Sequence, residues 1–208
     1  LMESPKKNIL VAPLNWGLGH ATRCIPIIKS LIKADFEPII ASDGAALVLL
    51  QKEFPFLKNY KLPSYNIKYA KKGKYLKLKL LLATPSIFLA SKNEQKVVAE
   101  IIDKEQISGI ISDNRLGAFS KEIPSVYITH QLNVLSGITT FITSKIHQKF
   151  IQKFNECWVL DIEGKNNLSG KLGHLNRKVE NIKYIGVLSR FKKQETALKY
   201  DLLVLLSG

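Results

Sequence analysis

The 208-residue sequence has little cysteine, few acidic residues and no long apolar run. Its two cysteines, Cys24 and Cys157, are too few for a disulfide framework, so we expect a reducing compartment, the cytosol. Residues 1–13 lack the long apolar core of a signal peptide. No stretch reaches the roughly 18 consecutive apolar residues of a transmembrane helix. We therefore expect neither a secreted disulfide-rich domain nor an integral membrane protein.

The shortage of acidic residues leaves a large positive charge. Asp and Glu number 17 against 31 Lys and Arg, which gives a formal net charge of +14. Such an excess favours an anionic partner: nucleic acid, a membrane surface or a phosphorylated substrate. Because the sequence has no helix-turn-helix, zinc or RNP motif, nucleic acid is not the expected partner.

Short apolar runs alternate with segments of helical periodicity. Strands are predicted at 8–13, 37–42, 107–112, 124–129, 157–160 and 183–187. Helices are predicted at 24–34, 44–54, 94–105 and 138–154. This alternation predicts an α/β fold, a doubly wound parallel sheet of Rossmann-like type. We assign 1–190 to this domain, and 191–208 to a linker and the first strand of a truncated second domain.

Ligands of open α/β sheets bind beyond the carboxyl ends of the strands, so residues at those ends are the candidates for a site. We predict that His20 and Asp113 are catalytic, because a histidine in a strand-to-helix loop can take a proton from a hydroxyl. The predicted substrate-binding residues are Gly17, Leu18, Gly19, Arg23, Asn114, Arg115, His130 and Gln131. The alternative is that these loops are merely polar and that Asp or Asn caps the next helix.

The glycines at 17 and 19 allow a ligand to approach the backbone, and the helix predicted to start near Thr22 or Arg23 favours an anion there. A dinucleotide fingerprint would need a third glycine where Thr22 stands, although Asp43 lies about 20 residues on, where a ribose-binding acid belongs. A dinucleotide-binding module therefore stays open as an alternative.

Two segments carry a resemblance to a known family. GLGHATR (17–23) resembles the N-terminal signature of GT-B glycosyltransferases, and is most similar to the MurG type (family 28-like), which adds N-acetylglucosamine to a lipid-linked peptidoglycan precursor. VYITHQLNVLSGITTFITSKI (126–146) resembles that family's later strand, loop and helix. SDNRLG (112–117) is similar to relatives of unknown acceptor. The resemblance spans nearly the whole chain, as the N-terminal half of such an enzyme.

The resemblance implies an acceptor-binding domain, whose partner domain holds a nucleotide-diphosphate sugar. It implies transfer of a hexose or N-acetylhexosamine to an acceptor hydroxyl, with His20 as the base. Neither a cofactor nor a metal is required, since helix N-termini can stabilise the departing diphosphate. These residues alone are expected to be inactive. A sugar-nucleotide epimerase of the same architecture is the alternative enzyme.

A lysine-rich segment interrupts the alternation, with no acidic residue between Glu53 and Glu94. Lysines beside apolar residues can dock on an anionic leaflet, which would suit a lipid-linked acceptor at the inner face of the plasma membrane. The predicted docking residues are Lys71, Lys72, Lys74, Lys77, Lys79, Leu80, Leu81 and Phe88. The alternative is a solvated lysine-rich surface beside a buried helix.

Overall fold

A computed structural model describes residues 6–65, 84–135, 137, 140–176, 179–191, 195, 197 and 199–204. Its centre is a seven-stranded sheet with the order β3-β2-β1-β4-β5-β6-β7, in which every neighbouring pair is parallel. The strands are β1 (Asn8–Pro13), β2 (Glu37–Ser42), β3 (Asn59–Lys61), β4 (Ile107–Asp113), β5 (Ser125–Thr129), β6 (Glu156–Val159) and β7 (Ile182–Tyr184).

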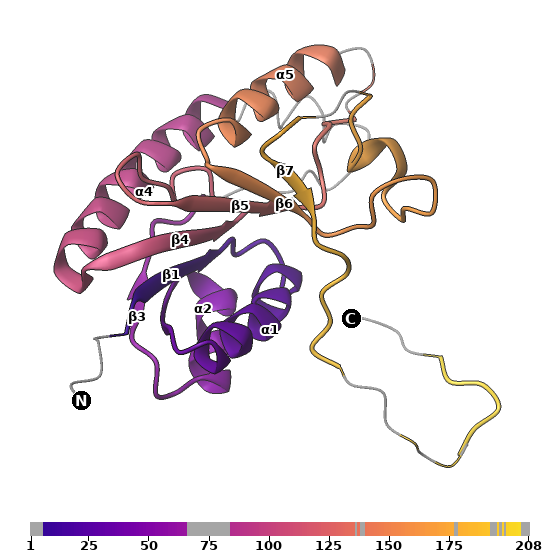
Figure 1. Cartoon of the computed structure of the whole chain (residues 1–208), viewed down its shortest axis with the longest axis horizontal. Coiled ribbons are helices and arrows are strands. Elements are labelled where there is room, and N and C mark those ends of the chain that lie inside the picture. Colours follow the sequence, from indigo (N-terminus) through magenta and orange to yellow (C-terminus); the bar gives the residue numbers. More distant parts are fainter. Residues whose placement is uncertain are drawn as a thin grey trace.

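Helices cover both faces of this sheet (Figure 1). One face carries α1 (Gly19–Lys33) and α2 (Gly44–Glu53), and the other carries α4 (Thr84–Glu105) and α5 (Thr140–Ile151). A short 3-10 helix, η3 (Gly170–Leu172), follows β6. The predicted doubly wound parallel α/β fold is confirmed.

Burial on both faces explains the continuous apolar strands. Val11 and Ile40 lie in the core formed with α1 and α2, while their chain neighbours Leu10 and Ile39 lie in the core formed with α4. A parallel strand covered by helices on both sides has no solvent-facing side that polar residues could occupy. The strands therefore lack the alternation of a half-exposed sheet.

The predicted start of α1 near Thr22 or Arg23 is wrong, because the helix begins at Gly19. Pro26 therefore stands at its eighth residue, where proline removes one backbone hydrogen bond. Ala21, Cys24 and Ile28 are each fully buried on this helix, and their packing holds the turn together despite that loss.

Other boundaries also differ. The structure begins α4 at Thr84, ten residues before the predicted 94–105, and adds the edge strand β3, which the sequence did not predict. β3 is three largely polar residues long, and only its pairing with β2 makes it a strand. Residues 201–204 form no strand within the described part of the chain, and 205–208 lie outside it, so the second domain stays a prediction.

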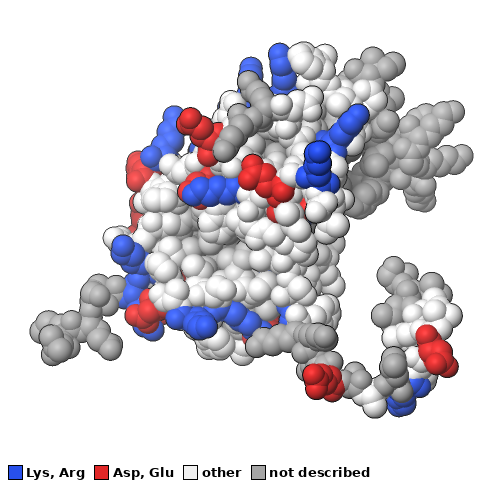
Figure 2. Space-filling model, turned by 45° about the vertical axis from the view of Figure 1, so that its right-hand side comes forward, with Lys and Arg blue, Asp and Glu red and all other residues white. Residues whose placement is uncertain are grey.

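Within the described ranges, no helix is both long enough and apolar enough to span a membrane. On the face drawn in Figure 2, Lys and Arg side chains are interspersed with Asp and Glu. Among the described residues that this view shows, positive and negative side chains therefore lie next to one another.

Candidate functional site

The site lies where β1 and β4 run side by side, the point at which the strand order reverses. Open α/β sheets bind ligands outside the carboxyl ends of the strands at such a switch point. Here β1 leads into the glycine loop and α1, and β4 ends at Asp113. A backbone hydrogen bond of 2.9 Å from Leu14 N to Asp113 O joins the two strand ends.

The glycine loop borders open space. Gly17 has a φ of +75°, a conformation that glycine adopts without strain. A Cβ atom added at Gly17 or at Gly19 would meet nothing within 4 Å. Leu18, between them, is the N-cap residue of α1 and is 48% exposed. Bulkier residues would thus fit the fold at Gly19, so packing alone does not require a glycine there.

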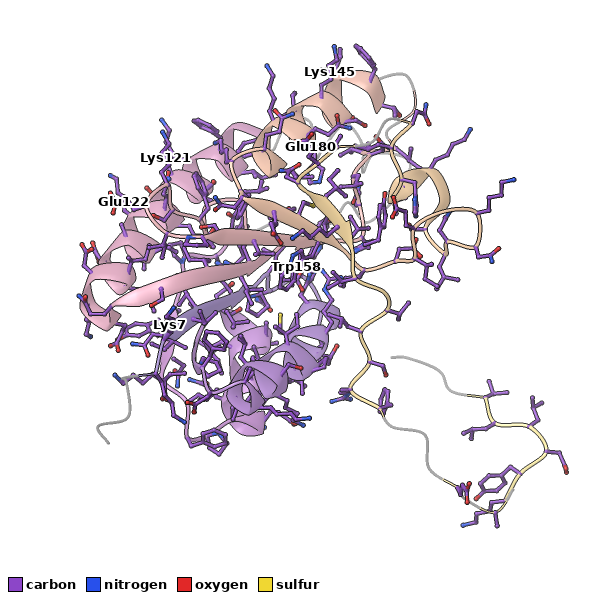
Figure 3. The ribbon with its side chains drawn as sticks, viewed as in Figure 1. Lys7, Lys121, Glu122, Lys145, Trp158 and Glu180 are labelled. Carbon is purple, nitrogen blue, oxygen red and sulfur yellow. The ribbon has the colours of Figure 1, made fainter. Side chains whose placement is uncertain are left out.

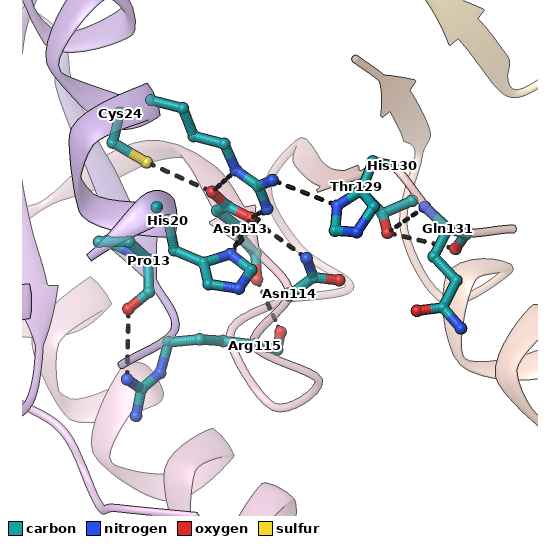
Figure 4. Close-up of polar contacts among 12 residues, drawn as sticks. Pro13, His20, Cys24, Asp113, Asn114, Arg115, Thr129, His130 and Gln131 are labelled. Atoms are coloured by element: carbon teal, nitrogen blue, oxygen red, sulfur yellow. Dashed lines mark hydrogen bonds and ion pairs between the residues drawn. The ribbon is translucent and has the colours of Figure 1, made fainter. Parts of the chain in front are cut away.

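His20 and Asp113 meet at this junction (Figure 4). His20 Nδ1 lies 3.0 Å from Asp113 Oδ1, and the Asp113 side chain is fully buried. A buried carboxylate on one nitrogen of an imidazole orients the ring and stabilises its protonated form. The two residues predicted to be catalytic are therefore in direct contact.

Arg23 completes the group. Its Nε and Nη2 atoms donate to the two different oxygens of Asp113, which is a bidentate pair. Its Nη2 also lies 2.7 Å from His20 Nδ1, and its Nη1 lies 3.3 Å from His130 Nδ1. Burial, together with the nearby Arg23 and His20, lowers the pKa of His130. The guanidinium thus contacts three predicted site residues at once.

Asn114 is fixed beside Asp113. It has a φ of +58°, which asparagine tolerates better than most residues. Its side-chain Nδ2 lies 3.4 Å from Asp113 Oδ1, and its side-chain Oδ1 accepts a 3.0 Å hydrogen bond from the Tyr127 hydroxyl. Burial raises the pKa of Tyr127 well above its usual value, so this hydroxyl stays a donor.

Arg115, which was predicted to bind substrate, does not point into the site. Its side chain is fully buried and points away from His20, toward the Pro13 carbonyl (Figure 4). It pairs with Glu94 and with Asp43, where Nη1 lies 2.7 Å from Asp43 Oδ1. The structure thus places Arg115 in an ion-pair network behind the site rather than in it.

Asp43 belongs to the same network. It stands at the N-cap position of α2 but makes no side-chain cap hydrogen bond there. Its carboxylate instead accepts from Arg115, from the Ser64 hydroxyl and from Asn15 Nδ2 at 3.3 Å, and the residue is 3% exposed. A ribose could reach this carboxylate only by breaking a buried ion pair, which disfavours the dinucleotide-binding alternative.

His130 and Gln131 follow β5. The Thr129 hydroxyl accepts from Gln131 N at 3.0 Å, and His147 on α5 lies 2.9 Å from the Gln131 carbonyl. In Figure 4 the His130 ring faces the His20–Asp113 pair, while the Gln131 side chain points away from it. Of these two residues, the structure therefore brings only His130 to the site.

Cys24 is a member of the site that the sequence reasoning missed. Its Sγ lies 3.8 Å from Asp113 Oδ2, and burial raises its pKa well above the usual value, so it remains a thiol. His20, Arg23 and Cys24 stand at positions i, i+3 and i+4 of one helix. That spacing places them on one face and was the signal that could have found Cys24.

Among the residues that the structure describes, no group of three or more His, Cys, Asp or Glu side chains could hold a metal ion. Of the predicted membrane-docking residues, only Phe88 is described, and it is 44% exposed on α4 with Lys92 Nζ 4.8 Å from its ring centre. Lys71, Lys72, Lys74, Lys77, Lys79, Leu80 and Leu81 lie outside the described residues.

No family model and no curated protein matches this sequence. Solved structures do match. The chain is similar to a UDP-glucosyltransferase from Polygonum tinctorium, with a TM-score of 0.52 at 11% identity over 77% of this chain and 48% of that one. It is also similar to a protein described as a UDP-N-acetylglucosamine 2-epimerase from Listeria monocytogenes, with a TM-score of 0.51 at 9% identity over 76% and 40%. Acinetobacter baumannii MurG matches with a TM-score of 0.47 at 12% identity over 76% and 42%.

The chain spans less than half of the length of each of these three proteins. At such low identity the likeness shows the fold alone, a Rossmann-like α/β unit of the kind found in GT-B glycosyltransferases. The narrower resemblance to the MurG type stays a prediction, as do the roles of the site residues.

Proposed function

We propose that this chain is the acceptor-binding half of a GT-B glycosyltransferase, which moves a hexose or N-acetylhexosamine from a nucleotide-diphosphate sugar to an acceptor hydroxyl. The observation that carries the proposal is the contact between His20 Nδ1 and the buried Asp113 at the sheet's switch point. The fold shared with a UDP-glucosyltransferase supports the same reaction class.

In this reaction the acceptor oxygen attacks the anomeric carbon, and the bond from that carbon to the diphosphate breaks. His20 Nε2 takes the hydroxyl proton, and Asp113 stabilises the imidazolium through Nδ1. The configuration at the anomeric carbon inverts, because the hydroxyl enters opposite the leaving group. The diphosphate leaves toward positive potential, to which the N-terminus of α1 contributes.

We extend the proposal to a lipid-linked acceptor of the cell envelope. The lysine-rich sequence between Glu53 and Glu94 supports docking on an anionic membrane surface, and Phe88 is exposed at its end. The donor half is needed for transfer, so the 208 residues alone should be inactive.

The test compares the full-length protein with its His20→Ala variant, using UDP- and TDP-sugars and following nucleotide release. His20→Ala should lower kcat by about 10²–10⁴ while leaving the fold intact. His174→Gln is the control, because this histidine contacts Asp161 rather than Asp113. An unchanged kcat in His20→Ala would remove His20 from the reaction.

An epimerase is the second candidate, and the match to the protein described as a UDP-N-acetylglucosamine 2-epimerase favours it. The two candidates differ in what happens without an acceptor. When no acceptor is present, an epimerase converts a UDP-sugar into its epimer. A transferase under the same condition leaves the configuration of the sugar unchanged. Analysis of the nucleotide sugars after incubation therefore separates them.

A further inference from the structure

His20 Nδ1 has two neighbours, one of which can only accept a hydrogen bond from it and the other of which can only donate one to it. Asp113 Oδ1, at 3.0 Å, can only accept a hydrogen bond. Arg23 Nη2, at 2.7 Å, can only donate one, because a guanidinium does not lose its proton in proteins. The nitrogen of a neutral imidazole either carries a proton or offers a lone pair, so only one neighbour can be satisfied at a time.

The two choices give different chemistry. If Nδ1 donates to Asp113, Nε2 has a lone pair and can take a proton. If Nδ1 accepts from Arg23, the proton sits on Nε2, which then cannot act as a base. Arg23 Nε and Nη2 already donate to the two oxygens of Asp113, so the second state satisfies Arg23 and leaves neither oxygen of the carboxylate without a donor.

Arg23 is held in that position by Asp113 itself. The bidentate pair uses Nε and Nη2, and the Asp113 side chain is fully buried. A phosphate group can also bind a guanidinium through two of its oxygens, so it can compete with Asp113 for Arg23. The space above Gly17 and Gly19, at the start of the same helix, is open to such a group.

We propose that Arg23 is a positioning residue that sets the tautomer of His20, keeping Nε2 protonated until a diphosphate draws the guanidinium away from Asp113. Release of Arg23 then lets Nδ1 donate to Asp113 and frees Nε2 to accept the acceptor's proton. The inference rests on the proposed function, and it couples arrival of the donor's phosphates to activation of the base.

Within the described part of the chain, Asp113 and Arg23 are the polar side chains that contact His20, and each of them has a further polar neighbour. Asp113 reaches His20 from β4 and Arg23 from its own helix. His130, in the loop after β5, contacts Arg23 on the far side of the guanidinium at 3.3 Å. Cys24 contacts the opposite oxygen of Asp113 as a neutral thiol.

The test is ¹⁵N NMR of the histidine side chains, which distinguishes the two neutral tautomers and the imidazolium, on the full chain in phosphate-free buffer. His20 signals are assigned with His20→Gln. Wild-type His20 should be in the Nε2–H form, and Arg23→Met should convert it to the Nδ1–H form. Lys29→Met, which removes a cation from the same helix where it pairs with Glu53, should leave the tautomer unchanged.

Inorganic pyrophosphate and UDP should each convert wild-type His20 to the Nδ1–H form, and orthophosphate at equal concentration should convert it less. In the Arg23→Met variant, neither pyrophosphate nor UDP should change the tautomer of His20. If Arg23→Met does not fold, Arg23→Lys takes its place, since a point charge cannot hold both oxygens and His20 together. His20 found as Nε2–H in these variants, or unmoved by pyrophosphate and UDP in wild type, would overturn the inference. Because no sugar transfer is measured, this failure is separate from an unchanged kcat in His20→Ala.

Discussion

Glu94 and Arg115 form an ion pair in which neither side chain has exposed surface. Asp43 pairs with the same guanidinium, and the Tyr65 hydroxyl bonds to Glu94 and to the Leu116 and Gly117 amides. This network links the end of β2, the helix α4 and the loop that follows Asp113. It therefore supports the candidate site from behind.

Replacing Arg115 should destabilise the fold strongly. Arg115→Met leaves two buried carboxylates without their cation, which costs about 3–5 kcal/mol of unfolding free energy. Lys29→Met removes an exposed partner of Glu53 and should cost under about 1 kcal/mol. Urea unfolding of the two variants measures the difference. Equal small losses would mean that the network adds nothing to stability.

The sequence predicted six of the seven strands and the winding of the sheet, because strands buried on both faces leave a continuous apolar run. It also predicted that His20 and Asp113 converge, since the carboxyl ends of parallel strands share one edge. It could not predict β3, whose three residues carry no apolar pattern and become a strand only by pairing with β2.

The sequence could not predict the ion-pair partners of Arg115 either. Glu94 and Asp43 lie 21 and 72 residues away in sequence, and nothing local separates an arginine that binds substrate from one that neutralises buried acids. Tertiary packing decides between the two. The predicted start of α1 was wrong for a related reason. Pro26 favours a later start, but burial of the core face of the helix outweighs that preference.

Two glycines should respond oppositely to alanine. A Cβ at Gly117 would lie 2.2 Å from the Ser91 carbonyl oxygen, so Gly117→Ala should destabilise the chain. A Cβ at Gly19 meets nothing within 4 Å, so Gly19→Ala should leave the melting temperature unchanged or raised, yet raise the KM of the full-length enzyme by filling space a substrate needs. An unaltered KM would indicate that substrate does not approach Gly19.

The stability of the fold should fall as pH falls below neutrality. Burial lowers the pKa of His147, whose Nε2 lies 2.9 Å from the Gln131 carbonyl, below its ordinary 6.5. The unfolded chain therefore binds a proton at higher pH than the folded one, and stability is lost as pH decreases from about 6.5 toward the folded pKa. Burial of His130 acts in the same direction.

Unfolding free energies at pH 7.5 and 5.5 measure this loss. His147→Gln keeps an N–H donor for the Gln131 carbonyl but cannot be protonated, so the variant should lose less stability between the two pH values than the wild type does. An identical loss in both proteins would show that His147 does not contribute to the pH dependence.

The last prediction concerns the lysine-rich sequence. If Lys71, Lys72 and Lys74 attract an anionic leaflet at about 1 kcal/mol each, changing all three to Gln should cost about 3 kcal/mol, more than a hundredfold in partitioning. Salt should weaken the charge term, since the Debye length falls from about 10 Å at 0.1 M to about 3 Å at 1 M. The apolar contribution of residues such as the exposed Phe88 should persist.

Cosedimentation with neutral and anionic vesicles across a salt series tests this prediction. The matched control changes Lys145, Lys149 and Lys153 to Gln, the same loss of charge at and just beyond α5, where Figure 3 shows Lys145 on the side away from the sheet. The control should bind anionic vesicles nearly as well as the wild type, because its lysines lie outside the docking segment. Equal weak binding of the wild type to both kinds of vesicle would mean that the lysine-rich segment is only a solvated surface. An equal loss in both triple variants would instead mean that net charge, rather than this segment, drives the attraction.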